Sequence, residues 1–80
     1  MTRPQIQSAV AEILSITVGR TIAATEAVTR DSEPSWDSLK HVELIFMLEE
    51  RFGVQFREDE MPELRSSEDI VHSLEEKRAA

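Results

Sequence analysis

Apolar side chains recur at three- and four-residue intervals in three stretches of the chain, the spacing of one face of an α-helix. The first stretch predicts a helix over about residues 4–17, and Gly19 is a natural stop for it. The others predict helices over residues 38–52 and about residues 67–78. The expected core residues of these helices are Ile6, Val10, Ile13, Leu14, Val18, Leu44, Ile45, Leu48, Phe52, Ile70, Val71 and Leu74.

The segments between these helices differ in length and character. Residues 19–37 form a long connection in which residues 22–28 can hold one helical turn, and Trp36 is expected to pack at the junction with the next helix. Residues 54–56 alternate like a strand, but a lone strand has nothing to pair with, so we expect an extended connector. Pro62 limits any helix beside it to about one turn.

The middle helix carries two apolar stripes. One stripe faces the core, and nearly opposite it lie Leu39, Val42 and Phe46. Because a surface helix needs only one buried stripe, the second predicts a docking surface. The acidic residues interleaved with that second stripe are Glu43, Glu49 and Glu50. The alternative is a central helix that buries both stripes, and an intermediate outcome would leave Leu39 partly covered.

The start of the same helix is suited to an anionic group. Asp37 is a good N-cap, because its carboxylate can accept hydrogen bonds from the free N–H groups of the first turn. Ser38 then occupies the first helical position, with its hydroxyl at the positive end of the helix dipole. Such a hydroxyl is a favourable attachment point for a phosphate. Gly53 can take the left-handed conformation that ends the helix.

Asp37-Ser38-Leu39, continued by Val42-Glu43-Leu44 and Leu48-Glu49-Glu50 to Phe52-Gly53-Val54, resembles the central motif of acyl carrier proteins. The resemblance implies that Ser38 is esterified with 4′-phosphopantetheine, a covalent group taken from coenzyme A, with Asp37 and Leu39 completing the motif. The group carries acyl cargo as a thioester. The family also implies a short third helix near Met61 and Leu64, and hence a small all-α four-helix bundle of three longer helices and one short helix, with a long first loop.

The resemblance also implies a set of partners. A phosphopantetheinyl transferase would modify the chain, a loading ligase or transferase would add acyl or aminoacyl cargo, and downstream enzymes with basic patches would receive it. The protein itself would not be an enzyme. The cargo stays open between fatty acyl, polyketide and aminoacyl groups. Lys40, His41 and Arg51 lower the negative charge of the helix and indicate a specialised rather than a housekeeping carrier.

Composition limits the function classes further. Residues 1–80 are enough for one domain. A net charge of −7 and a pI near 4.7 argue against binding to nucleic acid and to anionic membrane surfaces. The absence of cysteine excludes disulfides, thiolate metal sites and cysteine nucleophiles. Without an apolar signal core or a run of membrane length, we expect a cytoplasmic monomer with no membrane insertion.

Three other functions are compatible with parts of the pattern. Ser38 and His41 stand three residues apart on a helix, as in a nucleophile–base dyad, but no orienting carboxylate or oxyanion element accompanies them. An EF-hand over residues 31–42 fails, because Trp36 and Val42 stand where glycine and glutamate are needed, and no other metal site is expected. A small acidic helical adaptor, binding a partner groove without a prosthetic group, remains the main alternative.

Overall fold

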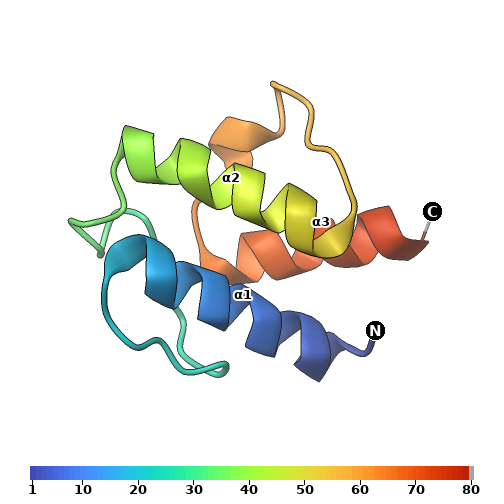
Figure 1. Ribbon diagram of the computed structural model, residues 1–80, viewed down its shortest axis with the longest axis horizontal. Helices are drawn as coiled ribbons and strands as arrows, with labels where there is room; N and C mark the ends of the chain where they lie inside the picture. The colour runs from blue at the N-terminus through green and yellow to red at the C-terminus, as the bar shows by residue number, and fades with distance from the viewer. Residues whose placement is uncertain (80) are drawn as a thin grey trace.

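The computed structural model describes residues 1–79, and its regular structure is helical. The α-helices are α1 (Arg3–Val18), α2 (Ser38–Phe52) and α3 (Ser67–Ala79), and one 3₁₀ turn, η1 (Met61–Glu63), precedes α3 (Figure 1). Over the described residues, β-pairing is limited to one isolated bridge. The all-α class is therefore confirmed. The four-helix bundle is not, because the expected short helix is a single three-residue turn.

The helices begin and end where the side chains provide caps. Asp37 accepts a hydrogen bond from the amide of Lys40 at 2.9 Å, as expected for the N-cap of α2. Gly53 follows with φ of 64°, a left-handed conformation that glycine adopts without steric cost. At α3, the hydroxyl of Ser66 accepts from the amide of Asp69 at 3.0 Å. These caps explain why the boundaries lie within a residue of those predicted.

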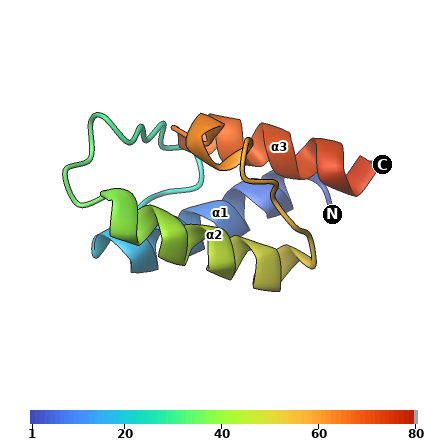
Figure 2. The ribbon, with the colours of Figure 1, turned by 90° about the horizontal axis from the view of Figure 1, so that it is seen from above.

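The core lies between the three helices, and α1 packs against both α2 and α3 (Figure 2). All the core residues predicted from helical spacing are buried. Leu14, Leu44, Leu48, Ile70 and Leu74 reach 0% exposure and bring the three helices into one cluster. Ion pairs from Arg3 to Glu68 and Glu75 join the start of α1 to α3 at the surface.

The long connection between α1 and α2 is held at several points rather than loose. Ile22, Val28 and Trp36 are buried in the core cluster. The helical turn that residues 22–28 could hold does not form; a tight turn closes there instead, with the amide of Glu26 bonded to the carbonyl of Ala23 at 3.0 Å. A hydrogen bond from the Arg20 guanidinium, assisted by the amide of Ala23, lowers the pKa of the Glu26 carboxyl.

The end of this connection is hydrogen-bonded to the start of α3. The amide of Arg30 donates to the carbonyl of Arg65 at 2.7 Å, and the amide of Ser67 donates to the carbonyl of Val28 at 2.8 Å. These bonds flank the isolated bridge at Thr29. Two segments far apart in sequence are thus fixed side by side, close to where α2 begins.

In the connection from α2 to η1, residues 54–57 form neither helix nor strand and residues 58–60 form a turn. One side chain of α3 secures this connection. Phe56 is buried, and the ammonium of Lys77 lies 5.0 Å from the centre of its ring. The same ammonium pairs with the carboxylate of Glu60 at 2.8 Å. That hydrogen bond, with one from the amide of Arg57, lowers the pKa of the Glu60 carboxyl.

The Glu60–Lys77 pair gives a pH-dependent contribution to stability. Because the pKa of Glu60 is lowered by folding, its contribution is present above the unfolded value of 4.5 and is lost as pH falls through the folded value. We expect Glu60→Gln to lower the free energy of unfolding near neutral pH by up to about 1 kcal/mol. The difference from the original protein should shrink in acid, as measured by chemical denaturation across pH. Glu63→Gln, at an exposed position of η1, is the control; an equal loss there would contradict the assignment.

Candidate functional site

Ser38 is the first residue of α2 and its side chain is exposed. The start of α2 lies beside the long connection, at the end of the molecule opposite both termini in the two views (Figures 1 and 2). The adjacent N-cap, Asp37, is also exposed. The hydroxyl is therefore accessible to a second protein that approaches this end.

Arg30 reaches the hydroxyl of Ser38 from the long connection. Its guanidinium Nη2 donates a hydrogen bond to Ser38 Oγ at 3.2 Å. The Arg30 side chain is half-buried. Sequence reasoning missed this residue, because it lies eight positions before Ser38 in a segment without periodicity. Only the folded path of the connection brings the two side chains together.

A buried histidine connects the three segments around Ser38. Trp36 Nε1 donates to His41 Nδ1 at 3.0 Å, and His41 Nε2 lies 2.7 Å from the carbonyl oxygen of Met61. This geometry assigns the neutral tautomer with the proton on Nε2, which donates to Met61. The two rings are also stacked, with centroids 6.0 Å apart. Trp36, His41 and the Met61 carbonyl form what we call the Trp–His clamp.

The clamp leaves no ring nitrogen of His41 for Ser38. Both nitrogens already have partners, and the ring is 7% exposed. A nucleophile–base pair between Ser38 and His41 is not formed in this arrangement, because the base would have to give up one of its two hydrogen bonds. His41 is buried next to Trp36, whose expected packing at the junction of the long connection and α2 is confirmed by its 2% exposure.

A mostly apolar pocket opens between α2 and η1, directly beside Ser38. Its volume is about 330 Å³. Arg30 and Ser38 lie at its polar side, and the rest of the lining comes from His41, Val42, Ile45, Phe46, Glu49, Met61 and Pro62. A group attached at Ser38 would therefore meet an apolar surface within a short distance. Phe46 lines this pocket, whereas its neighbour Met47 lies on the side of α2 facing α1.

The second apolar stripe of α2 is exposed. Leu39, Val42 and Phe46 are 68%, 51% and 65% exposed, so the helix does not bury both stripes. Leu39 is the most exposed of the three, which contradicts the intermediate outcome in which it is partly covered. We call these three side chains the apolar face of α2. It adjoins Ser38 and continues into the pocket through Val42 and Phe46.

The acidic residues around this face have different environments. Glu43 and Glu50 are exposed, and Glu43 forms a weak ion pair with Lys40 at 3.7 Å. Glu49 is half-buried, and its carboxylate accepts a hydrogen bond from the amide of Phe56 at 2.9 Å. Glu49 therefore also secures the connector after α2, whereas Glu43 and Glu50 are the more accessible charges.

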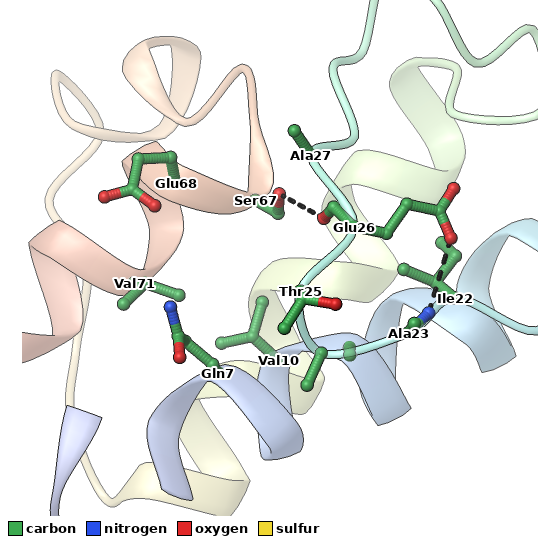
Figure 3. A pocket seen from close by; sticks show the side chains of 12 residues that line it. Gln7, Val10, Ile22, Ala23, Thr25, Glu26, Ala27, Ser67, Glu68 and Val71 are labelled. Atoms are coloured by element: carbon green, nitrogen blue, oxygen red, sulfur yellow. Dashed lines mark hydrogen bonds between the residues drawn. The ribbon is translucent and has the colours of Figure 1, made fainter. Parts of the chain in front are cut away.

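A smaller pocket of about 90 Å³ lies between α1, the long connection and α3 (Figure 3). Gln7 and Val71 point into it, and the carboxylate of Glu26 turns back to the amide of Ala23. The hydroxyl of Ser67 bonds to the carbonyl of Glu26 at 3.4 Å. The polar groups are thus used to hold the connection in place, and we assign this pocket a structural role.

Searches for other functional features and for relatives gave no assignment. Among residues 1–79, no three His, Asp or Glu side chains are grouped to hold a metal ion. In the same residues, no helix combines the length and apolar character needed to cross a membrane. Comparisons with protein-family models, with curated proteins and with solved structures found no match. Function is therefore inferred from the motif at Ser38 and from the geometry of the site.

The Trp–His clamp predicts coupled losses of stability. Trp36→Phe leaves the buried acceptor His41 Nδ1 unpaired, which should cost about 1–3 kcal/mol of unfolding free energy. His41→Gln should cost a similar amount, and the double variant should lose less than the sum by about 0.5–3 kcal/mol. Chemical denaturation of all four proteins measures this coupling. His72→Gln, which changes an exposed histidine, should shift stability by no more than about 0.5 kcal/mol. Additive losses would show that the hydrogen bond is unimportant.

Proposed function

We propose that this protein is an acyl carrier protein, in which Ser38 carries 4′-phosphopantetheine and presents thioester-bound acyl or aminoacyl groups to partner enzymes. The observation that carries the proposal is the exposed hydroxyl of Ser38 at the capped start of α2, next to an apolar pocket and an apolar face. The motif from Asp37 to Val54 supplies the resemblance to the family. The short η1 turn would take the place of the family's short third helix.

Attachment would proceed by transfer from coenzyme A. The Ser38 oxygen attacks the phosphorus on the pantetheine side of the pyrophosphate, a Ser–O–P bond forms, and the P–O bond to the adenosine 3′,5′-bisphosphate leaving group breaks. The hydroxyl proton passes to a base of the transferase. The cysteine-free chain then gains its one thiol at the end of a flexible arm. The thioester chemistry belongs to that arm, and the protein supplies tethering and recognition.

The apolar face of α2 is the proposed contact surface for partner enzymes. Leu39, Val42 and Phe46 would supply the buried contacts, and the accessible carboxylates of Glu43 and Glu50 would attract basic patches, with Glu49 at the edge. This attraction should weaken as ionic strength rises. The face lies next to Ser38, so an enzyme bound to it would have the attached arm within reach.

The same apolar face supports the alternative function, a small acidic adaptor that binds a partner groove without a prosthetic group. In that case Ser38 would be only the first residue of a capped helix. The two functions differ in one property that is simple to measure, the covalent modification of Ser38.

Modification is tested by incubating the protein with coenzyme A and a broad-specificity phosphopantetheinyl transferase, followed by intact-mass spectrometry. We expect one phosphopantetheinyl increment, which disappears in Ser38→Ala and persists in Ser35→Ala, at an exposed serine three residues earlier. Circular dichroism should show that both variants remain folded. An unmodified protein under all conditions would support the adaptor and overturn the carrier. An increment that survives Ser38→Ala would overturn the attachment at Ser38.

The contact surface is tested by two apolar substitutions at equal exposure. Phe46 and Ile16 are both 65% exposed, the first on the apolar face of α2 and the second on α1. Phe46→Ala should lower kcat/KM of the transferase reaction by about tenfold or more, the effect of losing an anchor worth at least about 1.4 kcal/mol. Ile16→Ala should leave kcat/KM unchanged. Equal effects of the two substitutions on kcat/KM would show that the apolar face of α2 is not the surface that the transferase recognises.

A further inference from the structure

We propose that Arg30 is the phosphate-holding residue of this site: its guanidinium binds the phosphodiester of the group attached to Ser38 and fixes the direction in which the arm leaves. This inference rests on the proposed attachment at Ser38. It names a residue outside the motif that carries the resemblance, because Arg30 precedes that motif by several positions and lies in the long connection.

The geometry places the guanidinium where the phosphate must form. Arg30 Nη2 already lies 3.2 Å from Ser38 Oγ, the oxygen that becomes the bridging atom of the ester. The two non-bridging oxygens of the phosphodiester are bonded to the phosphorus next to that oxygen, so a small rotation of either group brings them into contact. Arginine presents parallel N–H groups that match two such oxygens, which makes a charge-assisted, bidentate contact possible.

The charge of Arg30 is available for this contact. Four other arginines, Arg3, Arg20, Arg51 and Arg57, each pair with a carboxylate. Within residues 1–79, no carboxylate lies within ion-pair distance of Arg30. Arg65 and Arg78 also form no ion pair within these residues, but their guanidinium groups donate to the backbone carbonyls of Pro62 and Phe52, whereas that of Arg30 donates to Ser38 Oγ.

The backbone of Arg30 is held in place before any group arrives. Its amide donates to the carbonyl of Arg65 at 2.7 Å, and its carbonyl accepts from the amide of Glu33 at 3.3 Å. The first bond anchors the residue to the segment just before α3. Because the backbone is fixed, ordering the guanidinium on a phosphate requires restriction of the side chain alone.

The contact would also offset a repulsion and give the arm a direction. The carboxylate of Asp37 belongs to the residue preceding Ser38, so an attached phosphate adds a second negative charge close to it. Arg30 counters that charge from the side of the pocket, whose lining it shares with Ser38, Phe46 and Pro62. A phosphodiester held there directs the rest of the arm along the pocket between α2 and η1 rather than over the exposed end of the helix.

The test uses full-length protein that has been modified to completion, as verified by intact mass, so that reaction rates do not enter. The ³¹P resonance of the phosphodiester is compared between the original protein, Arg30→Gln and Arg30→Lys. We expect Arg30→Gln to shift the resonance and to lower its transverse relaxation rate, because the phosphate gains freedom when its partner is lost. Arg30→Lys keeps the charge without the paired N–H groups, so its resonance and relaxation rate should lie between those of the original protein and of Arg30→Gln. Added salt should shift the ³¹P resonance of the original protein toward that of Arg30→Gln, because salt screens the contact between the guanidinium and the phosphate.

Lys40→Gln is the matched control, since it removes one positive charge from the first turn of the same helix. It should leave the ³¹P resonance as in the original protein. Equal spectra for the original protein and Arg30→Gln would overturn the inference while leaving the carrier function intact. Equal changes in Arg30→Gln and Lys40→Gln would also overturn it, in favour of a general effect of charge. A protein that cannot be modified at Ser38 would instead overturn the proposed function.

Discussion

The site depends on two hydrogen bonds made by one buried imidazole. His41 accepts from Trp36 at the end of the long connection and donates to Met61 at the start of η1, while its own backbone belongs to the first turn of α2. These two bonds join the end of the long connection, the first turn of α2 and the start of η1. A buried polar group with both partners present is rigid, whereas one with a missing partner is costly. The position of the Ser38 hydroxyl and the shape of the adjacent pocket both follow from this joint.

A second set of bonds acts from the other side of the connection. The pairing near Thr29 joins the connection to the start of α3, and α3 is held to α1 by the core. The connection is therefore fixed at its end by the Trp–His clamp and farther back by α3. Arg30 lies between these two anchors, which is why a side chain from a loop can be directed at one particular oxygen. A long connection is therefore not mobile by virtue of its length, because hydrogen bonds to the rest of the fold can fix it.

Sequence reasoning found what is local or periodic. Helical spacing identified the buried core, and Asp37 and Gly53 gave the bounds of α2, because capping depends on neighbours along the chain. Sequence reasoning did not find the features that depend on contacts between distant segments. The helical turn that residues 22–28 could hold is replaced by a tight turn, in which the Glu26 carboxylate bonds to Arg20 and to the amide of Ala23. The approach of Arg30 to Ser38 follows from the same folded path and has no periodic signal.

The arrangement of the chain ends bears on how this molecule is handled. Both termini lie at one end of a body measuring 33 × 26 × 18 Å, and α2 starts at the other (Figure 1). An affinity tag, a fluorescent label or a bead coupled beside residue 1 or residue 79 would lie at the opposite end of the molecule from the start of α2 (Figure 1). Immobilised preparations coupled at that end would leave Ser38, the first residue of α2, facing the solution.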